Sequence, residues 1–416
     1  RIRVLGYVLI PYSQQEVLTL CWTSLPVISH KHSSTNAWNQ NFNNGNQNNN
    51  NKTNTNYVRG VAKRLKELNN LHMYEEFPIT FEDVVEADYS CRQNKRRKNS
   101  SLKFELELER NLQELFDELD SGNYVIGTSS CFVVTSPRVR EIWSASFRDR
   151  IVHHLVYNKI SPKWNRVFSA DSCACIPGRG TMYGAQRLEK HIRSFTNNWT
   201  QEKYYLKCDL ANFFVSINKD ILWELMNPKL PAGQIKRLTH QILFNDPTEN
   251  CSILSSDYLM SQVPENKRLI LAKENTGLPI GNLTSQFFAN VLLDVLDKYV
   301  KHELRVKKYV RYVDDCVLLG DNPAQLMEWK SLMDEKVQSL GLSFNPKKCF
   351  IQPVSRGVSF VGQTIYPHRR VPLKITADKC FDKVNEENLH CYLSFFQQSQ
   401  KSHNLCNKLV NHTRNY

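Results

Sequence analysis

The sequence has no hydrophobic run long enough to cross a membrane. Near the N-terminus the most apolar stretch, Val4 to Ile10, ends at Pro11, whereas a spanning helix needs about 20 mostly apolar residues. The first residues resemble a short signal peptide in charge and apolarity, yet no small-residue cleavage pattern follows them. With a mean hydropathy of −0.48, we expect a cytoplasmic protein without a membrane partner.

Closely paired cysteines are also missing. The chain has 12 cysteines but no Cys-x-x-Cys pair, and the closest two are Cys173 and Cys175. Several others, such as Cys131, Cys208 and Cys316, lie in apolar runs, where a free cysteine acts as a small hydrophobic residue. This pattern disfavours a disulfide framework or a zinc site and favours a reducing compartment.

Acidic residues are too few to balance the basic ones. Lys and Arg number 54 against 41 Asp and Glu, which leaves a formal net charge of +13. Such an excess favours a polyanionic partner, most simply nucleic acid. A basic, solvated surface without such a partner would give the same count, so charge alone leaves both interpretations open.

An asparagine-rich tract separates the N-terminal region from the rest. Between residues 36 and 56, 12 of the 21 positions are asparagine. Asparagine forms helices and strands poorly because its side chain competes for backbone hydrogen bonds. A tract of this composition buries too little apolar surface to offset the entropy lost on ordering, so we expect it to be disordered.

From residue 74 onward the composition is that of a globular protein, and the length predicts two or three subdomains. A mixture of helices and strands predicts an α+β or α/β core. A basic run over 92–98 is either a solvated loop or a phosphate contact. Apolar spacing predicts helices over 81–89, 102–119, 139–157, 287–300 and 389–410, and strands over 203–209, 309–313, 316–319 and 359–365.

Three acidic residues follow or join predicted strands. Asp314 and Asp315 are adjacent between two apolar strands, and Asp209 ends another strand. Each has an ordinary interpretation, because Asp is common in turns and at strand ends. Neighbouring strands of one sheet could nevertheless bring the three together, and converging carboxylates bind the hard divalent cations that nucleotidyl transfer needs.

From about Tyr74 to the C-terminus, the chain resembles reverse transcriptases, because short blocks typical of that family occur in the family's order. Residues 312–315 (Tyr-Val-Asp-Asp) resemble the YxDD signature, and Lys207 to Ile217 resembles the acidic block before it. The resemblance implies an α+β right-hand polymerase with fingers, a palm of antiparallel sheet plus helices, and a short helical thumb. The other blocks are 147–154 and 178–181 in the fingers, 277–290 in the palm, 345–348 for the lysine block and 360–362 for the primer grip.

The same resemblance implies a division of the chain into domains. The Asn-rich residues 1–72 stand apart from the polymerase. The remaining segments are an N-terminal helical extension over 73–140, fingers over 141–206, a palm over 207–362 with a fingers insertion near 222–276, and a thumb over 363–416.

The resemblance also implies catalytic roles. Asp209 and Asp314 match the carboxylates that bind two Mg²⁺ ions, and Asp315 matches the third, less direct ligand. Lys348 matches the lysine that meets the leaving pyrophosphate, with Lys347 as the weaker alternative. Phe214 matches the aromatic residue beneath the incoming sugar, which excludes a 2′-hydroxyl, so that the enzyme takes dNTPs and makes DNA.

Further positions match the substrate contacts of the family. Relatives often carry a basic pair before Gly178, where this chain has Ile and Pro, so Arg179 is the best candidate for a triphosphate contact. Ile280 and Gly281 match nucleotide-binding positions. The positions that match template or primer contacts are Arg148, Gln286, Phe360 and Gly362.

The block around Gly281 indicates a subfamily. Most reverse transcriptases have Gln before this glycine and end the block in Ser-Pro, whereas here Ile280 precedes Gly281 and Gln286 follows Ser285. That form is similar to the reverse transcriptases of diversity-generating retroelements, which copy a template-repeat RNA into cDNA and misincorporate at adenines. An aliphatic side chain cannot hydrogen-bond to the incoming nucleotide, which would loosen geometric checking. The short thumb further suggests a small, basic, helical-bundle accessory protein.

In such elements adenine-rich codons of the template repeat would translate as asparagine. Residues 1–72 are therefore interpreted either as translated template-repeat sequence, with Met73 as the true start, or as a disordered extension. Alternatives to the whole interpretation are a reverse transcriptase of the group II intron, retron or antiviral-defence type, an inactive nucleic-acid-binding scaffold, and an Asn-rich adhesion protein.

Overall fold

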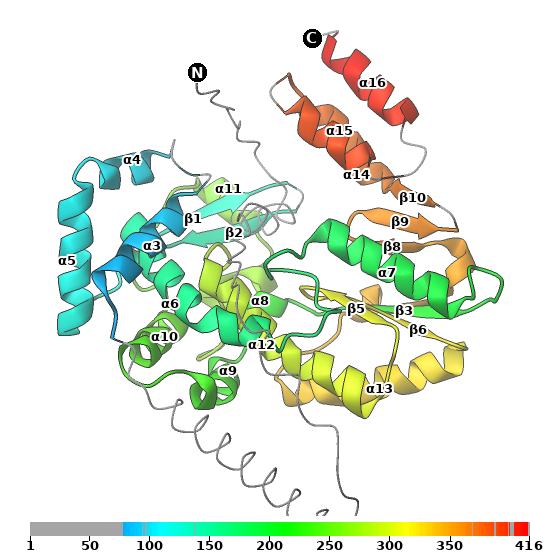
Figure 1. The fold of residues 1–416 in the computed structure, drawn as a ribbon, viewed down its shortest axis with the longest axis horizontal. Coiled ribbons are helices and arrows are strands. Elements are labelled where there is room, and N and C mark those ends of the chain that lie inside the picture. The colour runs from blue at the N-terminus through cyan, green and yellow to red at the C-terminus, as the bar shows by residue number, and fades with distance from the viewer. Residues whose placement is uncertain are drawn as a thin grey trace, which may run out of the picture.

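The computed structural model describes residues 78–414 except 94, 96–97, 137, 368, 387, 398 and 400–402. The Asn-rich tract and Met73 therefore lie outside the described residues. Figure 1 shows two lobes side by side and a small group of helices above the second lobe. Among the described residues, no helix combines the length and apolarity that a membrane span requires.

In the first lobe, helices surround a small sheet (Figure 1). Its sheet has the order β2-β1-β4, with β2 antiparallel and β4 parallel to β1. The strands are β1 (Ser129–Val134), β2 (Arg140–Ser144) and β4 (Cys251–Ile253). The helices are α3 (Phe81–Arg92), α4 (Asn99–Glu105), α5 (Leu108–Ser121), α6 (Phe147–Asn165), α9 (Lys219–Met226), α10 (Gln234–Phe244) and α11 (Asp257–Ser261), with the 3-10 turns η2 (Asn227–Lys229), η3 (Glu265–Lys267) and η4 (Leu269–Leu271).

The second lobe is built on a four-stranded antiparallel sheet of order β5-β6-β3-β7. In Figure 1, α7 and α13 lie on opposite sides of this sheet. The strands are β3 (Tyr204–Asp209), β5 (Tyr309–Tyr312), β6 (Asp315–Gly320) and β7 (Phe350–Pro353). The helices are α7 (Thr181–Phe195), α8 (Phe213–Ser216), α12 (Leu283–Lys298), the π-helix η5 (Tyr299–Glu303), α13 (Pro323–Ser339) and the 3-10 turns η6 (Pro346–Lys348) and η7 (Val354–Arg356).

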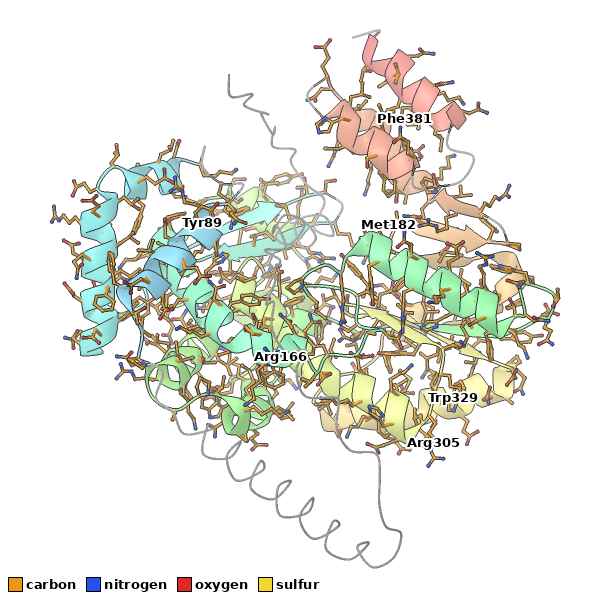
Figure 2. All side chains as sticks on the ribbon, viewed as in Figure 1. Tyr89, Arg166, Met182, Arg305, Trp329 and Phe381 are labelled. Carbon is orange, nitrogen blue, oxygen red and sulfur yellow. The ribbon has the colours of Figure 1, made fainter. Side chains whose placement is uncertain are left out.

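The C-terminal helices have a small hydrophobic core of their own, which contains Tyr392 and Phe396. Phe381 packs against this core (Figure 2). A three-stranded sheet connects these helices to the second lobe, and its Arg370 donates to the sulfur of Met182 on α7 (3.1 Å). The elements are β8 (Val358–Phe360), β9 (Gln363–Tyr366), β10 (Arg369–Pro372), α14 (Lys374–Lys383), α15 (Leu389–Gln397) and α16 (His403–Arg414).

Two predicted helices are wrong in extent. Residues 102–119 form parts of α4 and α5, and Leu106 lies between them with 84% of its surface exposed. Residues 140–144 form strand β2, because their backbone pairs with β1. Helix α6 begins only after Ser146, whose side chain accepts from the Asp149 amide and caps the helix.

The C-terminal predictions are also corrected in detail. The predicted strand over 359–365 is a hairpin of β8 and β9, which turns at Val361 and Gly362 with φ of 43° and 80°. The helical region over 389–410 is divided into α15 and α16. The predicted domain boundaries at 140/141 and 362/363 fall inside β2 and inside that hairpin. The segment 222–276 adds β4 to the sheet of the first lobe. The division into fingers, palm and thumb stays a prediction.

A buried ion pair stabilises the centre of the second lobe. Arg311 of β5 and Asp297 of α12 have 1% and 0% of their surfaces exposed, and two guanidinium nitrogens contact the carboxylate at 2.8 and 2.7 Å. The Tyr309 hydroxyl donates to the same carboxylate at 2.7 Å. Because removing either charge would leave the other buried and unpaired, this pair fixes α12 against the sheet.

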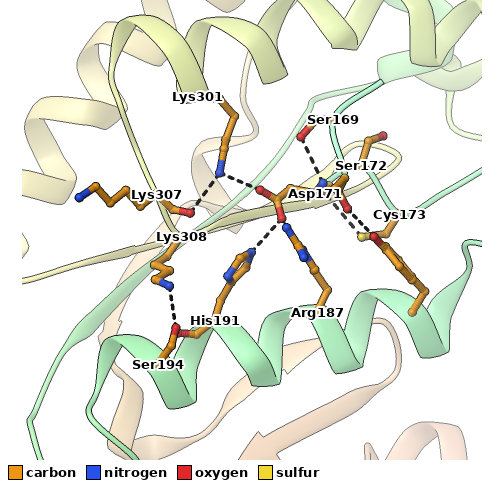
Figure 3. Close-up of polar contacts among 12 residues, drawn as sticks. Ser169, Asp171, Ser172, Cys173, Arg187, His191, Ser194, Lys301, Lys307 and Lys308 are labelled. Atoms are coloured by element: carbon orange, nitrogen blue, oxygen red, sulfur yellow. Dashed lines mark hydrogen bonds and ion pairs between the residues drawn. The ribbon is translucent and has the colours of Figure 1, made fainter. Parts of the chain in front are cut away.

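A second charged cluster connects the loop after α6 to α7 and η5 (Figure 3). The buried carboxylate of Asp171 accepts from Arg187 (2.7 Å), His191 (2.8 Å) and Lys301 (2.8 Å). Burial alone would favour the protonated form. The hydrogen bonds from His191, Lys301 and Arg187 outweigh it and hold the pKa of Asp171 well below its usual range.

This cluster predicts the acid stability of the fold. Asp171→Asn should lower the free energy of unfolding at pH 7 by about 2–3 kcal/mol, less than for a fully buried pair because Arg187 and Lys301 retain water. An acid with a lowered pKa stabilises the fold above its unfolded pKa of about 3.9 and loses that contribution as the pH falls further. In urea unfolding, the variant should therefore lose less stability than the parent between pH 5 and pH 2.

The control is Asp334→Asn on α13, whose partner Lys330 lies near the surface. A change there should be below about 1 kcal/mol. Equal losses in the two variants at pH 7 would contradict the structural role given to Asp171.

Candidate active site

The three predicted acids lie together at one end of the four-stranded sheet of the second lobe. Strand β3 pairs with β6 so that Asp209 is opposite Asp315. The Leu210 amide donates to the Asp314 carbonyl at 3.2 Å, which extends this pairing to the turn. The turn between β5 and β6 is tight, with Val313 at a φ of 54°. Residues 105 positions apart in the sequence are thus brought side by side by strand register.

The carboxylates affect one another's ionisation. Burial, and then the negative charge of Asp209, raise the pKa of Asp314 above its usual value. Burial also raises the pKa of Asp315 to about 6, although Lys207 lies 2.9 Å from its carboxylate and opposes the shift. Concentrated negative charge in a partly buried place favours the binding of protons or cations.

The predicted lysine, Lys348, forms an ion pair with the predicted acid, Asp209. Lys348 Nζ is 2.6 Å from the Asp209 carboxylate. Lys348 ends the turn η6, which is attached to β3 because the Asn345 amide donates to the Asp209 carbonyl at 2.8 Å. The lysine block therefore meets the first acid through both backbone and side chain.

Arginine 140 is a candidate that the sequence analysis missed. It opens strand β2, and its guanidinium interacts electrostatically with Asp314 and Asp209. Lys267 is also a neighbour of Asp209 and of Lys348. Had residues 140–144 been identified as a strand, Arg140 would have been recognised as its first residue. The first lobe thus contributes positive charge to a site built on the second.

The donor set fits magnesium. Among the residues that the structure describes, no group of three or more His, Cys, Asp or Glu side chains is already arranged as a metal site. Asp315 nevertheless keeps one buried carboxylate oxygen without a hydrogen-bond partner. Carboxylate oxygens are the ligands that Mg²⁺ prefers. Lys348 and Lys207 form ion pairs with Asp209 and Asp315 and supply positive charge to these carboxylates.

The predicted nucleotide contacts lie on two connected segments. Phe213 is buried and Phe214 is half-buried against it, with ring centroids 5.3 Å apart. The Phe214 carbonyl accepts from the Leu278 amide at 2.8 Å, which connects α8 to the loop that carries Ile280. Contact of Phe214 or Ile280 with a nucleotide stays a prediction.

The loop at Ile280 is attached to the first lobe. The Ile280 carbonyl accepts from the Trp143 amide of β2 at 2.8 Å. Gly281 has a φ of 136°, and a Cβ there would lie 2.6 Å from the Trp143 carbonyl oxygen. No side chain other than hydrogen fits this close approach. Glycine at this position therefore has a structural reason that is independent of any nucleotide.

The two predicted arginine contacts already have partners. Arg179 donates to the carbonyls of Ser169 and Ser172. Arg148 forms an ion pair with Glu118. A phosphate contact by either guanidinium would have to replace or share these bonds, so both assignments stay predictions.

The remaining predicted contacts are largely structural in this arrangement. The Gln286 side chain accepts from the Cys175 thiol, Phe360 is buried with 1% exposed, and Gly362 forms the β8–β9 turn. Their contact with template or primer stays a prediction.

The region that contains these residues matches a known family. A family model described as reverse transcriptase (RNA-dependent DNA polymerase) matches residues 135–365, more than half of the chain. The chain belongs to the reverse transcriptase family. This match covers Asp209, Asp314, Asp315 and Lys348, and it agrees with the α+β arrangement of a right-hand polymerase. The family description names an enzyme, an RNA-dependent DNA polymerase, which is a nucleotidyltransferase.

Solved telomerase structures from Candida tropicalis are similar to this chain. Apo telomerase truncated from the C-terminal domain is 14% identical with a TM-score of 0.42, covering 58% of this chain and 54% of that one. Telomerase in complex with a TWJ fragment of telomeric RNA is 12% identical with a TM-score of 0.40, covering 72% and 56%. A further apo telomerase is 13% identical with a TM-score of 0.43, covering 66% and 51%. This chain thus spans about half the length of these structures, and no curated protein matches it.

The raised pKa of Asp315 predicts a stability cost. Its charge is unfavourable in the folded protein, so Asp315→Asn should stabilise the metal-free protein by about 1–3 kcal/mol at pH 7.5. Below about pH 3.8 this carboxyl is protonated in both the folded and the unfolded state, so its charge costs no stability. Above about pH 6 the full cost of the charge is present. The gain in urea unfolding with EDTA should therefore be smaller at pH 4.5 than at pH 7.5.

Asp321→Asn is the matched control, because its carboxylate is paired with Lys203 near the surface. The pH trend expected for Asp315→Asn should be absent there. A gain that is the same at both pH values would show that burial does not raise the pKa of this carboxyl.

Proposed function

We propose that the protein is an RNA-directed DNA polymerase that extends a DNA primer on an RNA template from dNTPs. The convergence of Asp209, Asp314 and Asp315 within the family-matched region carries this proposal. The net charge of +13 suits an RNA–DNA hybrid held through its phosphates. The reaction is attack of the primer 3′-hydroxyl on the α-phosphate of the dNTP, with pyrophosphate as the leaving group.

Asp209 and Asp314 would hold two magnesium ions, with Asp315 beside them. When bound, the metal would supply activation of the 3′-hydroxyl and charge stabilisation of the phosphates. Lys348 would move its ammonium from Asp209 to the leaving pyrophosphate, where a fixed positive charge offsets developing negative charge. Arg140 and Lys267 would bind the triphosphate from the first lobe, in place of the predicted Arg179.

The subtype is proposed on sequence grounds. Ile280 places an aliphatic side chain where relatives have Gln, and its backbone is fixed to Trp143. We propose that this site copies a template-repeat RNA with adenine-directed errors, as in diversity-generating retroelements, together with a small basic helical-bundle accessory protein. The alternative is a reverse transcriptase of the intron, retron or antiviral-defence type, which would copy adenine faithfully.

Primer extension on an RNA template tests the activity. Asp314→Asn should lower the rate by about a thousandfold or more, because loss of metal-based charge stabilisation costs several kcal/mol. Asp334→Asn removes an acid of α13 that pairs with Lys330 and should leave the rate unchanged. An inactive parent protein, or an active Asp314→Asn, would refute the polymerase assignment.

The fidelity of Ile280→Gln tests the subtype. One additional hydrogen bond of about 1 kcal/mol to the incoming nucleotide should lower misincorporation opposite adenine about fivefold. Ile280→Leu keeps an aliphatic side chain and should keep the parent error pattern. Both are measured by sequencing the cDNA, and an unchanged adenine error rate in Ile280→Gln would remove the role given to Ile280.

A further inference from the structure

A row of three cysteines crosses the four-stranded sheet of the second lobe, beside the candidate active site. Cys208 of β3 is the register partner of Cys316 of β6. On the other side of β3, Lys207 pairs with Phe350 of β7, and this register continued by one residue sets Cys349 opposite Cys208. The Cys208 thiol interacts with the thiols of both Cys316 and Cys349. The three thiols therefore form one row across three adjacent strands.

The row lies on the sheet face opposite to Asp209, because successive side chains of a strand point to opposite faces. Helix α13 packs on this sheet, and its Lys330 is an electrostatic neighbour of Cys208 and Cys349. Cys208 and Cys316 have 0% and 1% of their surfaces exposed, whereas Cys349 is half-buried. Cys349 is thus the thiol of this row that solvent reaches.

The strand pairing permits a disulfide between Cys349 and Cys208, and the exposure of Cys349 distinguishes it from the buried Cys316. The Val354 amide donates to the Lys203 carbonyl, so the odd-numbered residues of β3 form the hydrogen-bonded pairs with β7. Cys208 and Cys349 therefore form a non-hydrogen-bonded pair, in which Cα atoms are about 4.5 Å apart. That spacing lies within the range of about 4.4–6.8 Å that a disulfide spans.

Each cysteine of the row is covalently next to a residue of the candidate site. A bond between two of the sulfur atoms would therefore act on the peptide units that position that site. The adjacent pairs are Cys208–Asp209, Asp315–Cys316 and Lys348–Cys349.

We propose that Cys208 and Cys349 are a peroxide-sensitive modification site, at which reversible disulfide formation switches nucleotide addition off. Hydrogen peroxide converts the Cys349 thiol to a sulfenic acid and releases one water. The Cys208 thiol then attacks the sulfenic sulfur, the S–S bond forms and a second water leaves. Two thiols lose two electrons and two protons in total, and one peroxide is reduced to two waters.

The expected inhibition follows from the bonds around Lys348. Its ammonium is 2.6 Å from Asp209, and formation of the S–S bond would pull the Cys208 and Cys349 side chains together and so shift the adjacent Asp209 and Lys348. A displacement of about 1 Å in such a site costs about 100-fold in rate. This effect on rate rests on the proposed function, whereas the disulfide itself does not.

The experiment treats the whole protein with hydrogen peroxide and follows two readouts. Tryptic cleavage after Lys207 and after Lys348 places Cys208 and Cys349 on separate peptides, so mass spectrometry without reductant detects their cross-link. Primer extension is measured before oxidation, after oxidation and after dithiothreitol. Cys349→Ser removes the reachable thiol, and Cys406→Ser removes a half-buried cysteine of α16 as the matched control.

We expect the Cys208–Cys349 cross-link and a loss of activity of about 100-fold in the parent and in Cys406→Ser, both reversed by dithiothreitol. Cys349→Ser should show neither. The proposal is overturned if peroxide oxidises Cys406 without forming this cross-link, or if Cys349→Ser loses activity as the parent does. A parent that is inactive before oxidation would instead refute the polymerase assignment, and the cross-link would still decide the pairing.

Discussion

The antiparallel register of β3 on β6 is the constraint on which the rest of the site depends. It sets Asp209 opposite Asp315 and aligns the next residue with the turn at Asp314. A slip by one residue would turn Asp209 to the other face of the sheet, because side chains alternate along a strand. Buried Leu206 and Cys208 oppose such a slip, since it would exchange apolar and charged positions.

Charge balance is the second constraint. Burial, and then the mutual repulsion of the carboxylates, disfavour their charged forms, and the raised pKa values of Asp314 and Asp315 express that cost. Lys348 and Lys207 offset it within the second lobe, and Arg140 offsets it from the first. Under the proposed function, a nucleotide with its metal ions would replace these contacts, and the charge that costs stability would then serve binding.

Much of the site could be predicted from sequence, because local patterns carry it. A strand that ends in Asp209 and a hairpin with Asp314 and Asp315 are recognisable from apolar runs and turn residues. The order of family-like blocks then predicted the α+β fold, and the family match confirmed the reverse transcriptase assignment. The lysine block of the same series predicted Lys348, whose ammonium is 2.6 Å from the Asp209 carboxylate.

The parts that sequence did not predict depend on long-range pairing. Strand β2 forms because its backbone pairs with β1 and because its Trp143 amide donates to the Ile280 carbonyl. The local spacing of residues 140–144 shows neither partner. Arg140 was missed for this reason. The bonds of Arg179 to loop carbonyls likewise require the folded chain.

The most direct measurement is anomalous diffraction from crystals of the protein soaked in Mn²⁺ with an RNA template, a DNA primer and a non-reacting dNTP analogue. The account predicts anomalous peaks bound by the carboxylates of Asp209 and Asp314, beside the α-phosphate and the primer terminus. Peaks located elsewhere, with the hybrid bound away from these carboxylates, would contradict it.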